Sequence, residues 1–180
     1  MEKRIKLRDK TFRVMIPAED IDAALERVAE RLNHDYAGRT PVFLGVLSGA
    51  FLFLSDLVRK TDFNSQLAFV KISSYEGTQS TGKVQQQMGV DFDIEGRDII
   101  IVEDIVETGH SMNYLLAHLR AKKPASIVIC TLFFKPDKFL YEYPIDYAAF
   151  SIGNEFIVGY GLDYAQKYRN LPFIGVVEQQ

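Results

Sequence analysis

Four short, continuous runs of apolar residues, rich in β-branched and aromatic side chains, restrict what this chain can fold into. A half-buried strand alternates apolar and polar residues, whereas continuous runs indicate strands covered on both faces. Two of the runs lead through a short turn into a helical pattern. This predicts an α/β fold with a mostly parallel, twisted sheet flanked by helices. The runs are 42–47, 67–72, 99–102 and 127–134, and the helical patterns are 51–60 and 111–122.

The chain is predicted to form a single domain over residues 1–180. Its length, with 47% hydrophobic residues, suffices to bury a core, and no repeat or linker interrupts it. Crowded aromatic residues from Pro136 onward indicate either a small aromatic-rich hood subdomain or ordinary aromatic core. The hood would use mainly residues 136–180 together with the N-terminal segment. An amphipathic helix is predicted between Pro17 and Gly38, with Ile21, Leu25, Val28 and Leu32 on its packed face.

The charge balance and the cysteine count exclude several classes of protein. The net charge is −3, from 24 acidic and 21 basic residues, which disfavours binding to nucleic acid or to an anionic membrane. Cys130 is the only cysteine, so no intrachain disulfide forms, and its apolar surroundings predict a buried thiol. Neither a secretion signal nor a membrane span is visible, and we expect a cytoplasmic protein.

The residues with the clearest chemistry follow the run at 99–102. A buried strand brings Glu103 and Asp104 to its carboxyl end, where ligands bind in parallel sheets, and Glu107 follows. Residues 108–111, Thr-Gly-His-Ser, open a helix whose free N–H groups form an anion site. Carboxylates beside a bound phosphate can accept hydrogen bonds from ribose hydroxyls or hold Mg²⁺. Two acids alone would more often mark a solvated turn, but the third acid and the Thr-Gly-x-Ser helix start favour the ligand site.

Other phosphate and metal motifs are absent from the sequence. It has no Gly-x-Gly-x-x-Gly, and the Thr-Gly-Lys at 81–83 lacks the earlier glycine and the strand of a P-loop. The spacing of His34, His110 and His118 does not indicate a zinc site. The sequence therefore favours a phosphorylated sugar as ligand over a dinucleotide or a P-loop nucleotide.

Residues 102–109, Val-Glu-Asp-Ile-Val-Glu-Thr-Gly, resemble the phosphoribosyl pyrophosphate motif of the type I phosphoribosyltransferases. The similarity runs from about Val14 to Val177 and is closest to the hypoxanthine-guanine phosphoribosyltransferases. Its separated matches are 47–51, 73–75, 102–109, 135–136 and 156–165 with 168–169. The resemblance implies the type I phosphoribosyltransferase fold. It also implies an Mg²⁺-dependent purine salvage enzyme that transfers 5-phosphoribosyl from phosphoribosyl pyrophosphate to N9 of a 6-oxopurine.

The resemblance also implies roles for residues of the central motif. Glu103 and Asp104 would face the ribose hydroxyls and the Mg²⁺ shell. Glu107 would help to move a proton from the N7 region of the purine. The loop that holds the 5′-phosphate would comprise Glu107, Thr108, Gly109, His110 and Ser111, with Met112 behind it.

For the purine, the resemblance implies that Lys135 donates to the exocyclic O6, that Phe156 stacks on the ring and that the backbone of Ile157 reads its edge. An ammonium has only donors, so a 6-amino group would leave it unpaired. Asp163 would lie at the purine and contact the metal ion, and Arg169 would face pyrophosphate. Without the resemblance, each of these residues has an ordinary structural explanation.

Two loops complete the expected site. The resemblance implies that Ser48 and Gly49 bind pyrophosphate, through a loop that in the family often carries a non-proline cis peptide, here Leu47–Ser48. The stretch 74–82, with Ser74 and Tyr75, resembles a mobile loop that closes over the reacting centre.

The sequence departs from the family pattern at two positions. Ser48 stands where many members have Lys or Arg, so a side-chain charge is missing. Glu107 stands where many members have Asp, and its additional methylene extends its reach by roughly 1.5 Å. We expect activity to survive the second change.

Some alternatives stay open. One is a regulatory relative that senses phosphoribosyl pyrophosphate and binds nucleic acid, which the charge balance opposes. Another is a transferase for a different base, which Lys135 and Phe156 oppose. The ranking of hypoxanthine, guanine and xanthine stays open, as does the choice between a homodimer and a homotetramer.

Overall fold

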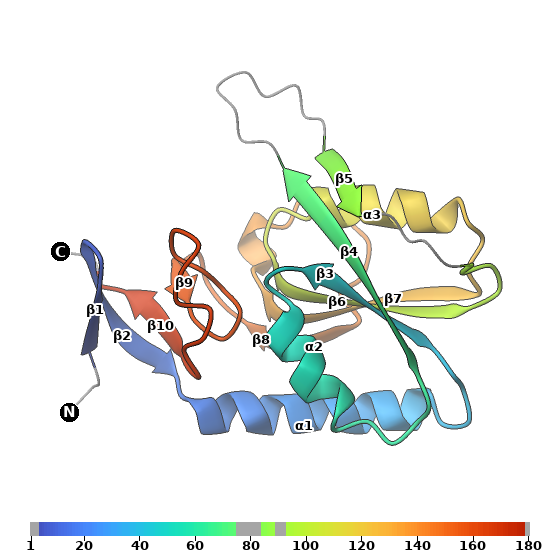
Figure 1. The fold of residues 1–180 in the computed structure, drawn as a ribbon, viewed down its shortest axis with the longest axis horizontal. Helices are drawn as coiled ribbons and strands as arrows, with labels where there is room; N and C mark the ends of the chain where they lie inside the picture. Colours follow the sequence, from blue (N-terminus) through green and yellow to red (C-terminus); the bar gives the residue numbers. More distant parts are fainter. Residues whose placement is uncertain (1–3, 75–83, 89–92, 179–180) are drawn as a thin grey trace.

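The larger part of the fold is a six-stranded sheet (Figure 1) in a computed structural model that describes residues 4–74, 84–88 and 93–178. Five neighbouring strands run parallel, and the edge strand β5 pairs antiparallel with β4. This confirms the predicted α/β fold. In spatial order the strands are β5 (Val84–Met88), β4 (Gln66–Ser74), β3 (Val42–Leu47), β6 (Asp98–Val106), β7 (Ser126–Phe134) and β8 (Tyr147–Ser151).

Helices cover both faces of this sheet, because successive residues of a strand point to opposite sides. Ile100 of β6 packs in one apolar cluster with the first two helices, whereas its neighbour Ile101 packs in another cluster with the third. The central strands are therefore apolar on both faces, as their continuous runs predict. The helices are α1 (Ala18–Asp35), α2 (Phe51–Val58) and α3 (His110–Arg120).

Helix α1 matches its sequence signals. Pro17 is the residue before its first turn, and Gly38 lies just beyond its end with a φ of 73°, a conformation that other residues rarely adopt. All four residues predicted on the packed face are buried, as are Ala24 and Ala29. The predicted helix is therefore confirmed with its start and its stop.

A second, smaller sheet is antiparallel and takes its strands from both ends of the chain. Phe12 and Val158 form its fully buried core with Leu7. Figure 1 shows it to one side of the main sheet. Its strands, in spatial order, are β1 (Arg4–Leu7), β2 (Lys10–Ile16), β10 (Ile174–Val177) and β9 (Ile157–Val158). The single domain and the hood boundaries stay predictions. Strand β8 lies within residues 136–180 but belongs to the main sheet.

Three further predictions concern particular segments. Cys130 is a free, buried cysteine, and burial raises the pKa of its thiol far above the ordinary range. Ser74 ends β4, but the rest of the expected mobile loop, including Tyr75, lies outside the described residues. Among the helices of the described residues, none has the length and apolar character to cross a bilayer.

Candidate active site

The predicted site residues lie where neighbouring parallel strands end. Strand β3 leads to Ser48 and Gly49, β6 carries Glu103 and Asp104 near its end, and Lys135 follows β7 directly. These three strands are adjacent in the sheet, so their carboxyl ends meet at one edge. Ligands of open α/β sheets bind at this edge.

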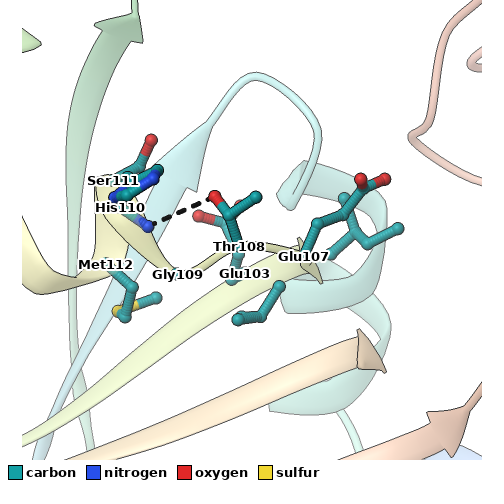
Figure 2. Close-up of a pocket in the computed structure, with 9 residues that line it drawn as sticks. Glu103, Glu107, Thr108, Gly109, His110, Ser111 and Met112 are labelled. Carbon is teal, nitrogen blue, oxygen red and sulfur yellow. Dashed lines mark hydrogen bonds between the residues drawn. The ribbon is translucent and has the colours of Figure 1, made fainter. Parts of the chain in front are cut away.

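A cavity of about 160 Å³ follows the chain from the end of β6 into the first turn of α3. Figure 2 shows its lining residues in sequence along this loop, with the Thr108 hydroxyl directed toward the backbone N–H of His110 at 3.5 Å. The predicted phosphate-loop residues lie together here, and Met112 is buried behind the loop, where it was expected. The lining residues are Glu103, Ile105, Val106, Glu107, Thr108, Gly109, His110, Ser111 and Met112.

Gly109 ends the loop and precedes α3 in a left-handed conformation with a φ of 84°. The first N–H groups of a helix have no partner within the helix, and such groups can bind an anion. A Cβ at Gly109 would lie 2.6 Å from atoms of Phe139 and Tyr143, so only glycine fits. The loop is thus shaped both by its own glycine and by aromatic residues packed against it.

These aromatic residues form a strap, residues 139–143, that the sequence analysis did not assign to the site. Tyr143 donates its hydroxyl to the Gly109 carbonyl at 2.7 Å, and the Leu140 N–H donates to the Thr108 carbonyl at 3.2 Å. The Tyr141 hydroxyl lies 2.7 Å from His110 Nδ1. Burial raises the pKa of Tyr143 to about 12, so its hydroxyl stays a donor at neutral pH.

Glu103 and Asp104 are adjacent, partly buried carboxylates. Burial and the charge of Asp104 raise the pKa of Glu103 well above its ordinary value, and burial also raises the pKa of Asp104. The Asp104 carboxylate fills the space beside Gly49, where an added Cβ would overlap its Oδ2. A divalent cation would offset the cost of keeping both groups ionised, so this pair fits a metal ion chemically.

Lys135 is almost fully buried, with 3% of its side chain exposed. Its ammonium lies 2.7 Å from Glu107 Oε1 and donates to the Glu155 carbonyl at 3.0 Å. A second lysine, Lys138, lies 3.0 Å from Glu107 Oε2. Burial alone would raise the pKa of Glu107, but the hydrogen bonds and charges of the two lysines outweigh burial and lower it.

Arg169 and Asp163 lie in the segment between β9 and β10. Arg169 forms an ion pair of 2.6 Å with Asp163 and donates to the Gly161 carbonyl at 2.6 Å. Gly161 has a φ of 99°, and a Cβ there would overlap the carbonyl oxygen of Gly49. Residues predicted to bind metal and pyrophosphate therefore approach the Gly49 loop together.

The predicted purine side is lined by Phe156 and Ile157. The Phe156 side chain is 42% exposed and packs edge to face on Tyr164, with ring centroids 5.7 Å apart, while Ile157 is buried. The Lys135 contact to the Glu155 carbonyl brings the buried ammonium beside this segment. Ser48 is exposed, and the peptide Leu47–Ser48 is cis, as the resemblance implies.

The chain combines a parallel α/β sheet with an acid pair and a glycine-containing loop after one strand. Comparison with known proteins identifies the class of protein that has this arrangement. The family model of the phosphoribosyl transferase domain matches residues 17–165, and the chain belongs to the phosphoribosyltransferase family.

The similar proteins narrow this class. The chain is 41% identical to "Hypoxanthine-guanine phosphoribosyltransferase" of Streptococcus agalactiae serotype V over 169 residues, 93% of this chain and 94% of the relative. It is 40% identical to the protein of the same name from Streptococcus thermophilus strain CNRZ 1066, over 100% of this chain and 97% of the relative. The crystal structure of a hypoxanthine phosphoribosyltransferase from Staphylococcus aureus superposes with a TM-score of 0.87 at 38% identity, covering 92% and 90% of the two chains. The resemblance seen in the sequence is confirmed.

Proposed function

We propose that this chain is a purine salvage enzyme that transfers 5-phosphoribosyl from phosphoribosyl pyrophosphate to N9 of a 6-oxopurine, hypoxanthine or guanine, giving IMP or GMP and pyrophosphate. The observation that carries the proposal is the buried Lys135 ammonium, held at the same edge of the sheet as the acid pair and the phosphate loop. Similarity to hypoxanthine-guanine phosphoribosyltransferases over the full chain supports it.

In this proposal the loop 108–111 binds the 5′-phosphate through the N–H groups at the start of α3. The net charge of −3 does not oppose this, because backbone donors rather than side-chain cations receive the phosphate. Ser48 brings no charge to the pyrophosphate side, so backbone N–H groups and Arg169 carry that contact. Glu103 and Asp104 accept hydrogen bonds from the ribose hydroxyls.

Glu103, Asp104 and Asp163 are the residues that would hold Mg²⁺. Within residues 4–74, 84–88 and 93–178, no group of three or more His, Cys, Asp or Glu side chains forms a metal site by itself. Mg²⁺ commonly binds through one or two carboxylates together with water and substrate phosphates, and the acid pair fits that pattern. When bound, the ion supplies positive charge beside the leaving pyrophosphate.

Lys135 supplies the preference for a 6-oxopurine. An ammonium has three N–H donors, and two of them point to Glu107 and Glu155. The remaining donor is available to the purine O6. A 6-amino group would place donor against donor in a buried position, which strongly disfavours adenine.

The reaction breaks the bond between the anomeric carbon of the ribose and pyrophosphate as N9 of the purine attacks from the opposite face, with inversion. Positive charge builds on the purine ring, and Glu107 accepts the proton lost from the N7 region. The lowered pKa of Glu107 keeps it ionised and able to do so at neutral pH. Phe156 stacks on the purine while the Ile157 backbone contacts its edge.

The proposal is tested by a spectrophotometric assay with phosphoribosyl pyrophosphate and Mg²⁺, run in parallel on hypoxanthine, guanine, xanthine and adenine. We expect product from at least one 6-oxopurine and none from adenine. No product from any 6-oxopurine would reject the proposed activity, and turnover of a different base would replace the substrate. Assembly as a homodimer or homotetramer stays a prediction.

Replacing Gly49 by alanine is expected to lower kcat/KM for phosphoribosyl pyrophosphate by roughly 10²-fold, the cost of a displacement of about 1 Å at a reacting centre. The added Cβ would overlap the Asp104 carboxylate, so the carboxylate or the loop has to move. Gly175→Ala is the control, because its Cβ would lie 3.4 Å or more from its neighbours. Unchanged kinetics in Gly49→Ala would show that kcat/KM for phosphoribosyl pyrophosphate does not depend on the position of the Asp104 carboxylate.

Tyr143→Phe is expected to raise KM for phosphoribosyl pyrophosphate roughly two- to tenfold with little change in kcat. The substitution removes the hydrogen bond to the Gly109 carbonyl, worth about 0.5–1.5 kcal/mol, and leaves the packed ring in place. Steady-state kinetics test this. Tyr114→Phe on α3 removes a hydroxyl outside the strap and serves as the control. An unchanged KM in Tyr143→Phe would mean that the strap does not hold the phosphate loop.

A further inference from the structure

Lys138 belongs to a single turn of 3₁₀ helix, η1 (Pro136–Lys138), that follows Lys135. The turn is closed by a hydrogen bond of 3.1 Å from the Lys138 N–H to the Lys135 carbonyl. Lys135 is the residue before this helix, so the turn brings Lys138 back toward it. The ammonium groups of both lysines contact Glu107.

We propose that Lys138 is a positioning residue that holds the Glu107 carboxylate in its proton-accepting place through its contact of 3.0 Å with Oε2. The inference rests on the proposed function, in which Glu107 receives a proton from the purine. It adds a residue that the family motifs quoted above do not contain.

The two lysines hold Glu107 in different ways. Lys135 is buried and also bonded to the Glu155 carbonyl, so its contact to Glu107 Oε1 is fixed. Lys138 contacts the other oxygen, Oε2, with 37% of its side chain exposed. Water can solvate this ammonium when the contact breaks, so Oε2 is released at lower cost than Oε1.

Lys138 also restricts the orientation of the Glu107 side chain, which is longer than an aspartate. A glutamate has one more rotatable bond than an aspartate, and its carboxylate has more positions available. Lys135 fixes one oxygen of Glu107, and Lys138 fixes the other. With both oxygens held, the longer side chain is restricted to one orientation.

The charges around Glu107 give the expected direction of a pH effect. Lys135 from the end of β7 and Lys138 from η1 are the charged groups that lower the pKa of Glu107, against its burial. Glu103 and Asp104 precede it on β6. Removing the Lys138 charge should therefore raise the pKa of Glu107. A carboxylate accepts a proton only when it is ionised. As the pH is lowered, the variant should therefore lose activity at a higher pH than the wild type does.

The experiment measures kcat/KM for hypoxanthine against pH in Lys138→Gln and Lys138→Arg, with Lys123→Gln as the control at an exposed lysine beyond the far end of α3. The value of kcat/KM in Lys138→Gln is divided by that in Lys138→Arg at each pH, which removes the effect of groups that titrate alike in both variants. We expect this ratio to be constant near neutral pH and to fall at low pH by about tenfold, for a shift of about one pH unit. Lys123→Gln should follow the wild type throughout.

A second measurement does not depend on turnover. NMR titration of carboxyl-labelled glutamate, with the Glu107 signal assigned from its loss in Glu107→Gln, gives the pKa of Glu107 directly. A higher pKa in Lys138→Gln than in Lys138→Arg supports the inference. Equal pKa values, or a ratio of kcat/KM that does not change with pH, would overturn it. If the wild type turns over no purine, the proposed function fails while the NMR comparison still decides the role of Lys138.

Discussion

Glu107→Gln is expected to lower kcat by about 10²–10⁴-fold while raising KM for phosphoribosyl pyrophosphate much less. Glutamine keeps the size of the side chain but cannot take up the purine proton. Its single carbonyl oxygen can accept from one of Lys135 and Lys138, and its amide group then faces the other as a donor. Steady-state kinetics with both substrates separate the two parameters.

Glu107→Asp is the matched control for this variant, because it keeps the carboxylate and shortens the side chain by one methylene. We expect it to retain most of the activity, since many members of the family have Asp at this position. Thermal unfolding of both variants shows whether the unpaired lysines weaken the fold, because an uncompensated buried ammonium at Lys135 is destabilising. Equal turnover in Glu107→Gln and the wild type would remove Glu107 from the mechanism.

The main sheet was predictable because its strands carry their signal locally. Residues 42–47 form a strand with the predicted bounds, and the run at 99–102 extends to Asp98–Val106. The small sheet had no such signal. Strand β9 is two residues long and is stabilised by pairing, as Gly175 of β10 lies opposite Val158. Such pairing depends on partners far away in the chain, which a local pattern does not reveal.

The chemistry of the candidate site was also predictable in kind, because acids after a strand and a Thr-Gly helix start have definite uses. The contacts between its residues were not. Lys138 reaches Glu107 only because Pro136–Lys138 forms a 3₁₀ turn, and a lysine at this spacing is ordinarily a solvated surface residue. Likewise, the sequence shows Tyr143 only as one of the crowded aromatic residues after Pro136, whereas in the fold its hydroxyl donates to the Gly109 carbonyl.

Turnover in excess chelator should be near zero and should recover when Mg²⁺ is added above the chelator concentration, because of the acid pair. Glu103 and Asp104 are adjacent, and the Asp104 carboxylate lies against the Gly49 loop, where pyrophosphate is expected. Phosphate groups brought beside two carboxylates are repelled unless a cation lies between them. Chelator loaded with Mg²⁺ beforehand is the control for direct inhibition by the chelator.

The small number of carboxylates at the site also determines how the ion binds. Because the described residues hold no cluster of three or more metal-ligating side chains, the ion has to take its other ligands from water and from the substrate. Calorimetry should therefore show weak binding of Mg²⁺ alone, weak binding of phosphoribosyl pyrophosphate alone, and much tighter binding of the two together. Tight binding of the substrate in chelator, with full turnover, would leave Glu103 and Asp104 as ligands of the ribose hydroxyls only.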